Sequence, residues 1–177
     1  GTGKLGELTD TYDPDGTVIK HNSNFVTIEM LQAACASFGL GYLQTPPVYS
    51  ALKFQGQRLS DLQRNHGGEA NMDTYEIAAN KSRWIDLYEL SLQIFENPYF
   101  TIQAHVSSGT YIRSLINDIA LRSNSCATTI KLERHAIGPF ELTNALQLMD
   151  LNPDQIKQSL MSVTNLLELI DSYALNN

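Results

Sequence analysis

The chain has 177 residues and a formal net charge of −7 at pH 7, from 12 Lys and Arg against 19 Asp and Glu. This length allows one domain with a substantial core and excludes two large ones. No apolar run is long enough to cross a membrane, and no signal-peptide pattern opens the chain. The two cysteines, Cys35 and Cys126, are too few for a metal site or a disulfide framework. They predict reduced thiols and a cytoplasmic protein.

The acidic balance argues at first against a nucleic-acid partner, but the charges are unevenly distributed. Residues 1–49 hold two Lys or Arg against five Asp or Glu, and residues 136–177 hold one against five. The middle of the chain, 50–135, holds nine of each and is neutral. Basic residues are therefore concentrated in the middle, and the acidic excess belongs to the two ends.

The first part of the chain contains clear turn and cap residues. Asp13-Pro14-Asp15-Gly16 predicts a turn, because proline fixes φ and glycine tolerates positive φ. Thr27 is typical of a helix N-cap, and apolar residues at helical spacing follow it until Gly39. Pro46 and Pro47 exclude a helix at that point and are expected to stiffen the backbone. The predicted elements are a strand at 17–19, a helix between Thr27 and Gly39, and a strand at 48–52.

The remaining elements predict the fold class. Residues 55–73 are polar and glycine-containing, which predicts a mobile or protruding segment with a short helix at 59–64. Since strands and helices then mix without a regular βαβ repeat, we predict an α+β fold with a mostly antiparallel sheet. The later elements are strands at 85–95 and 99–106 joined at Asn97-Pro98, a helix opening near 112 with Ile112, Leu115, Ile116, Ile119 and Ala120 on one face, a strand at 128–132, and a last helix capped by Asn152-Pro153 with Ile156, Leu160, Val163 and Leu167 inward.

Arg113 stands in an unusual position. The strand that ends at Val106 runs into a turn of small residues, and the next helix begins with this arginine in its first turn. A cation is unfavourable there, because a helix N-terminus already carries partial positive charge. The arrangement suggests an anion beside Arg113, either a carboxylate or a phosphate. The alternative is an ordinary surface arginine.

Four segments in chain order resemble the tRNA pseudouridine-55 synthase (TruB) family. The resemblance implies an α+β pseudouridine synthase core over residues 1–140, with a mixed, mostly antiparallel sheet flanked by helices. It also implies an inserted RNA-gripping (thumb) segment at about 49–73, and we expect residues 141–177 to form a helical extension packed on the core. The four segments are Leu5-Gly6 with Thr9-Asp10-Thr11-Tyr12-Asp13 and Gly16; Gln44 to Lys53 with Gly56, Arg58, Leu59 and Arg64; Ser108 to Leu115 with Asp118; and Leu132 to Phe140.

The resemblance implies that a uridine at position 55, flipped out of the T-loop of tRNA, is isomerised to pseudouridine. In the family an aspartate attacks this uridine, and neither a metal nor an organic cofactor is needed. The implied partner is the tRNA T-arm, and a monomer is expected when the protein is complete. The family's catalytic segment would lie upstream of Gly1, and its base-stacking tyrosine, absent here, would stand just before Leu5. We therefore expect this chain to be a fragment that is inactive alone, with Arg113 left without its carboxylate.

The resemblance assigns roles residue by residue. Arg113 matches the arginine that pairs with the catalytic aspartate, which it would orient and keep ionised. Leu132 matches a leucine near the uracil, although plain core packing is the alternative. Tyr111 belongs either to the pocket wall or to the core, and Gly109 allows close backbone approach. For Lys53, Arg58 and Arg64 the functional reading is contact with RNA phosphates, and the alternative is a solvated loop.

Some residues depart from the family pattern. Asp13-Pro14 resembles the family's catalytic Leu-Asp-Pro only superficially, and its register places Asp13 in a later motif, so we do not expect it to be the nucleophile. Ser108 and Glu133 stand where lysine and arginine are common, which reduces the positive charge available for RNA. An alternative function is therefore a non-catalytic RNA-binding or tRNA-folding module of the same fold. A third interpretation is an unrelated α+β protein.

Overall fold

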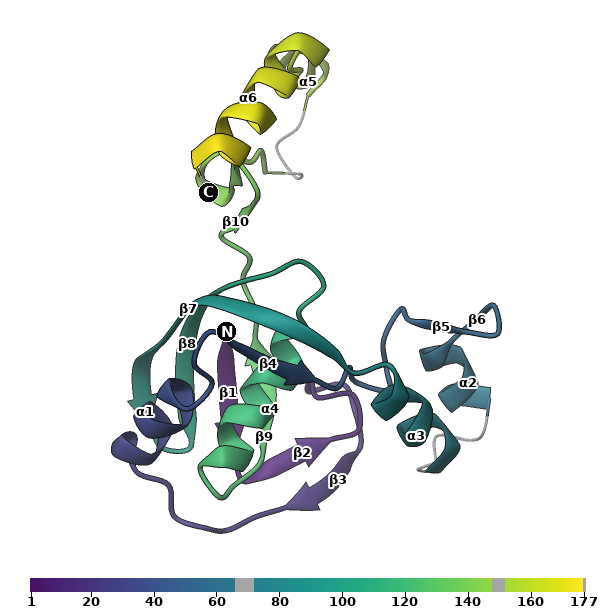
Figure 1. The fold of residues 1–177 in the computed structure, drawn as a ribbon, viewed down its shortest axis with the longest axis vertical. Helices are drawn as coiled ribbons and strands as arrows, with labels where there is room; N and C mark the ends of the chain where they lie inside the picture. Colours follow the sequence, from purple (N-terminus) through teal and green to yellow (C-terminus); the bar gives the residue numbers. More distant parts are fainter. Residues whose placement is uncertain (66–71, 148–151, 177) are drawn as a thin grey trace. The chain divides into compact units, whose positions relative to one another are not determined.

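The computed structural model describes residues 1–65, 72–147 and 152–176. The chain divides into two compact units, Gly1–Leu132 and Glu133–Asn177, and each is described by itself (Figure 1). We predicted a core at residues 1–140 and a helical extension at 141–177 that packs on it. Both the boundary at residue 140 and this packing stay predictions. Within the described ranges no helix is both long and apolar enough to span a membrane.

The first unit is built on a five-stranded sheet in the order β4-β7-β8-β1-β9. Every neighbouring pair in it is antiparallel. This confirms the predicted α+β class with an antiparallel sheet, and the predicted strands at 85–95, 99–106 and 128–132 are all present. The strands are β1 (Thr2–Leu5), β4 (Gly41–Gln44), β7 (Arg83–Glu96), β8 (Tyr99–Val106) and β9 (Ala127–Lys131).

Two helices pack on this sheet and enclose the main core. Helix α1 (Ile28–Ala36) begins at Thr27, whose side chain accepts a hydrogen bond from the Met30 amide, as its cap position predicts. Helix α4 (Ile112–Arg122) buries the predicted apolar face. Gly3 lets α4 approach β1, because a Cβ there would lie 2.6 Å from Ile116 and 2.7 Å from Phe100. Among the core residues are Leu31, Phe38, Ile85, Phe100, Leu115, Ile116 and Ile119.

Of the segment at 49–73, residues 66–71 lie outside the described residues, and the rest forms small elements with a second cluster of buried residues. A two-stranded ladder joins β5 (Lys53–Phe54) to β6 (Gln57–Arg58), and α2 (Leu59–Asn65) follows. The predicted helix at 59–64 is confirmed. The predicted strand at 48–52 is wrong: the chain bends there, the Ser50 amide bonds to the Val48 carbonyl, and pairing starts only at Lys53. Val48, Leu59 and Ala78, the last from helix α3 (Met72–Asn80), form the second cluster.

A smaller antiparallel pair, β2 (Glu7–Thr9) and β3 (Val18–His21), flanks the turn at residues 10–17. The predicted strand at 17–19 is confirmed by β3, shifted by one residue at its start. This pair matters for the site, because the turn between its strands carries the aspartates Asp10, Asp13 and Asp15.

The described part of the second unit has two short strands, a 3-10 turn and two helices. The predicted single helix after Asn152 is wrong, because the chain is extended at Leu160 and Ser162 caps a new helix by accepting a hydrogen bond from the Asn165 amide. The Asn152 capping box is confirmed. The four apolar side chains expected to face inward, from Ile156 to Leu167, are exposed. The elements are β10 (Ala136–Ile137), β11 (Phe140–Glu141), a 3-10 turn at Leu142–Asn144, α5 (Pro153–Ser159) and α6 (Val163–Asn176).

Candidate active site

The Arg113 guanidinium lies at the N-terminus of α4 and has three oxygen partners. Its Nη1 donates to Asp13 Oδ2 at 2.5 Å and to the Thr11 carbonyl at 2.6 Å, and its Nη2 donates to the Tyr49 carbonyl at 3.2 Å. The Arg113 side chain is 26% exposed and the Asp13 side chain 31%. The anion predicted beside this arginine is therefore present, and it is a carboxylate of this chain.

The turn between β2 and β3 directs Asp13 at Arg113. Thr9 Oγ1 donates to the Asp13 carbonyl at 2.7 Å, and Thr11 Oγ1 donates to Asp13 Oδ1 at 2.6 Å. Asp10 Oδ1 closes the turn by accepting from the Thr17 amide at 2.8 Å. These bonds leave Asp13 Oδ2 directed at the guanidinium.

Arg113 is thus paired with Asp13, and its expected pairing with a catalytic aspartate from outside this chain stays a prediction. The sequence did not indicate the contact with Asp13, because the two residues are 100 positions apart and spacing within one motif says nothing about such a contact. Sequence reasoning correctly placed Asp13 in a turn. Its exclusion as the nucleophile is a separate statement and stays a prediction.

Tyr111 and Gly109 line one small cavity beside α4. The cavity measures about 90 Å³ and is bounded by Gln44, Pro46, Leu52, Lys81, Arg83, Gly109 and Tyr111. Gly109 has φ +75°, and a Cβ there would collide with the Arg83 guanidinium, which donates to the Ser108 carbonyl. The close approach predicted for Gly109 is therefore real, although its neighbour is Arg83. Arg83 was not singled out from the sequence, because a single arginine at a strand end carries no motif. Gln44 was named only as the first residue of a family-like segment, and no role was assigned to it.

Leu132 follows the last residue of β9 and is 55% exposed. Plain core packing, the alternative for this residue, does not hold within the first unit. A Cβ on Gly1 would lie 3.4 Å from Ile112 and 3.5 Å from Leu132. Leu132 therefore lies near Ile112, the residue before Arg113 in α4. Its role beside the uracil stays a prediction.

The basic residues of the segment at 49–73 are only partly brought together. Lys53 and Arg58 are directly paired across the β5–β6 ladder, and both are exposed. Like charges directly opposite each other weaken a strand pair unless an anion lies between them. Arg64 lies in α2, and its side chain is outside the described residues.

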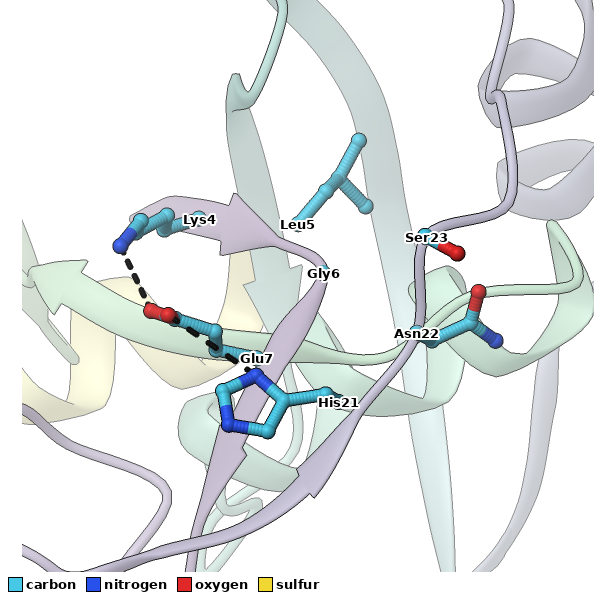
Figure 2. A pocket seen from close by; sticks show the side chains of 7 residues that line it. All are labelled: Lys4, Leu5, Gly6, Glu7, His21, Asn22 and Ser23. Atoms are coloured by element: carbon cyan, nitrogen blue, oxygen red, sulfur yellow. Dashed lines mark hydrogen bonds and ion pairs between the residues drawn. The ribbon is translucent and has the colours of Figure 1, made fainter.

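A larger hollow of about 270 Å³ lies where β1 passes into β2 (Figure 2). Lys4 Nζ lies 2.6 Å from Glu7 Oε2, and His21 Nδ1 lies 4.0 Å from Glu7 Oε1. The hydrogen bond between Lys4 and Glu7 raises the pKa of Lys4 and lowers the pKa of Glu7. No residue predicted for the site lines this hollow, and its lysine, Lys4, is already paired with Glu7. Among the described residues no group of three or more His, Cys, Asp or Glu could hold a metal ion.

Comparison with known proteins identifies the family. The family described as "TruB family pseudouridylate synthase (N terminal domain)" matches residues 1–112 of this chain. Human pseudouridylate synthase TRUB1 is 38% identical over 166 residues, covering 93% of this chain and 45% of the relative. tRNA pseudouridine synthase B of Clostridium acetobutylicum is 35% identical over 173 residues, covering 98% of this chain and 57% of the relative. The chain spans about half the length of these relatives. It belongs to the TruB family of pseudouridylate synthases.

Proposed function

We propose that residues 1–177 form the arginine-bearing and RNA-binding part of a tRNA pseudouridine synthase that acts on a flipped uridine of the T-loop. The observation that carries the proposal is the Arg113 guanidinium, held at the first turn of α4 by Asp13 and two carbonyl oxygens. Family membership supplies the reaction, and this geometry supplies the group that would orient its nucleophile.

The guanidinium has donors left for a second carboxylate. Arginine carries five N–H donors, and the bonds from Arg113 to Asp13, Thr11 and Tyr49 use three of them within the described part of the chain. An N–H on Nε and one on Nη2 remain. In this proposal a nucleophilic aspartate from outside residues 1–177 binds there. The positive charge would keep that carboxylate ionised, and a guanidinium already fixed by Asp13 would hold it in a single orientation.

The reaction requires no oxidant or reductant. The bond between N1 of the uracil and C1′ of the ribose breaks, a bond between C5 and C1′ forms, C5 loses its proton, and N1 gains one. The aspartate attacks and later leaves, so it is regenerated. Tyr111 and Leu132 are proposed to border the base, and Gly109 to let the backbone approach it.

The proposed partner is the T-arm of tRNA, bound through phosphates. The exposed pair Lys53 and Arg58 supports this, because an anion between the two would relieve their repulsion. Arg64 is proposed to extend the same surface. No metal and no organic cofactor takes part in the proposal. A cytoplasmic location and a monomeric complete protein are further parts of it; both cysteines are free and buried, as reduced thiols would be.

The test is tritium release from T-arm RNA labelled with [5-³H]uridine. The protein expressed with the coding sequence upstream of Gly1 is expected to release tritium, its Arg113→Ala variant to release it at least about a thousandfold more slowly, and residues 1–177 alone to release none. A protein that includes the upstream sequence and binds the RNA without any release would contradict catalysis.

That last outcome would favour the non-catalytic RNA-binding or tRNA-folding module. The observation in its favour is that Asp13, the one carboxylate paired with Arg113 in the described ranges, already balances the charge of the arginine without any nucleophile. If residues 1–177 bound no T-arm RNA even at low salt, the module would fail too, because phosphate contacts are strongest there.

A further inference from the structure

The N-terminus of α4 is held by a residue of another element. Tyr111 occupies the N-cap position, but its side chain makes no capping hydrogen bond. Instead, Gln44 at the end of β4 bonds to both backbone groups of Tyr111. Gln44 Oε1 accepts from the Tyr111 amide at 2.8 Å, and Gln44 Nε2 donates to the Tyr111 carbonyl at 3.1 Å. Gln44 is only 2% exposed, so both bonds are shielded from water.

The orientation of the Gln44 amide is itself fixed by Tyr42, two residues earlier on the same face of β4. Gln44 Nε2 also donates to Tyr42 Oη at 2.8 Å, and Tyr42 Oη donates to Asp118 Oδ2 at 2.6 Å. A reversed amide would bring Oε1 against the Tyr111 carbonyl, so one orientation satisfies all partners. Asp118 lies on α4, and the hydrogen-bonded chain therefore starts and ends on the same helix.

Aromatic rings and a further hydrogen bond surround these hydrogen-bonded side chains. The Tyr42 ring packs edge-on against Phe38, with ring centroids 4.6 Å apart. The Arg122 guanidinium lies 3.5 Å from the centre of the Phe38 ring and also faces Tyr42. A further bond between the same segments, from Ser114 Oγ to the Thr45 carbonyl at 3.1 Å, fixes the residue next to Arg113. Buried, fully satisfied networks of this kind hold one geometry.

We propose that Gln44, Tyr42 and Asp118 are positioning residues, whose hydrogen-bonded chain fixes the Tyr111 backbone and with it the placement of Tyr111 and Arg113 for the reaction. The inference rests on the proposed function. None of the three residues touches the proposed substrate; they act through the start of α4. A displacement of that start by a fraction of an ångström would misplace the guanidinium and the proposed pocket wall together, and such misplacement lowers the rate of the chemical step more than it lowers binding.

The experiment compares Gln44→Met with the parent protein, both expressed with the coding sequence upstream of Gly1. Methionine keeps the length of the side chain and removes its three hydrogen bonds. We expect kcat for tritium release to fall about tenfold or more, with the dissociation constant for T-arm RNA changed less than about twofold. Hydrogen exchange of the Tyr111 amide should accelerate by about tenfold or more, because its acceptor is gone. Gln93→Met, the same substitution at an exposed site on β7, should leave all three values unchanged.

Tyr42→Phe provides a second, milder variant, since it keeps the ring contact with Phe38 and removes only the hydroxyl. It should lower kcat about threefold to tenfold, with RNA affinity retained. A folded Gln44→Met or Tyr42→Phe protein with the kcat of the parent would overturn the inference, and so would equal losses of kcat and RNA affinity. If the parent itself releases no tritium, the proposed function fails, whereas the Tyr111 exchange measurement still tests the positioning chain directly.

Discussion

Arg113 Nη1 lies 2.5 Å from Asp13 Oδ2, and this contact joins the turn after β2 to the first turn of α4. Both side chains are partly shielded from water. The pair thereby adds a side-chain contact to a turn that is also bonded to β9 through the Tyr12 carbonyl and the Thr129 amide. It also occupies one side of a guanidinium that is proposed to orient a second carboxylate.

We predict that this pair contributes about 1–2 kcal/mol to the free energy of unfolding, the range for a partly buried, charge-assisted bond. A double-mutant cycle of Asp13→Asn and Arg113→Met, measured by urea denaturation, should give a coupling energy of that size. Thr11 can still donate to an asparagine at position 13, so the turn is preserved. A coupling energy indistinguishable from zero would mean that the contact has no energetic role.

Gly109→Ala should destabilise the protein for two separable reasons. Its φ of +75° strains an alanine, and the new Cβ would collide with Arg83. We expect a loss of about 1–2 kcal/mol in the free energy of unfolding, because the atoms in the way are the far end of an exposed, flexible side chain that can shift at low cost. Gly56→Ala is the matched control: its φ is +85°, but nothing lies within 4 Å of its Cβ position, so it should lose only the backbone part, about 1 kcal/mol.

The collision can be tested directly by combining Gly109→Ala with Arg83→Ala. The shorter side chain should recover the difference between the two glycine variants and leave the strain at residue 109 in place. Equal losses for Gly109→Ala and Gly56→Ala would show that Arg83 moves aside at no cost.

Lys53→Ala and Arg58→Ala should each weaken binding of T-arm RNA in proportion to a lost phosphate contact. The slope of the logarithm of the binding constant against the logarithm of salt concentration should fall by about one for each variant. Lys20→Ala, which removes an exposed lysine of β3, is the control and should leave the slope unchanged. Unchanged slopes for both variants would show that Lys53 and Arg58 are solvated residues that do not contact RNA phosphates.

The pH dependence of stability should show the buried Asp118. Burial raises the pKa of Asp118 from 3.8 to about 6, and the Tyr42 hydrogen bond and the Arg122 charge offset part of this increase. Between pH 4 and 6 the folded state therefore binds more protons than the unfolded state, so this group lowers stability as pH rises through that window. The loss is at most about 3 kcal/mol above pH 6.

Asp118→Asn should remove that loss, because an asparagine oxygen still accepts from Tyr42 without carrying charge. Urea denaturation from pH 4 to pH 7 should show the parent losing stability relative to the variant as pH rises. A constant difference across the range would show that the carboxyl does not titrate in this window.

The predictable part of the fold is the part with regular patterns. Strict alternation from Phe100 to Val106 predicts β8, and 3.6-residue spacing after Ile112 predicts α4; both are confirmed. Val48 is apolar and looked like the start of a strand, but it packs against Leu59 and Ala78 in a small cluster. Helix α3 was not predicted.

The part of the site that the sequence predicts is the presence of an anion beside Arg113. A cation in the first turn of a helix predicts an anion, and the anion is there. Which carboxylate supplies it depended on the path of the chain between Thr9 and Thr17, which no local pattern describes. The role of Gln44 could not be predicted for the same reason: its bonds to Tyr111 join residues 67 positions apart.

The place of β1 in the sheet has a consequence for folding. Its residues Thr2 to Leu5 lie between β8 and β9, and Thr2 pairs with both Thr101 and Lys131. During synthesis β1 must therefore wait for β9, which begins only at Ala127, before it is paired on both sides. Such long-range pairing slows folding and leaves two strand edges exposed during synthesis. A nascent chain stopped before residue 127 would carry β1 with one edge bare, and it would be a natural substrate for chaperones.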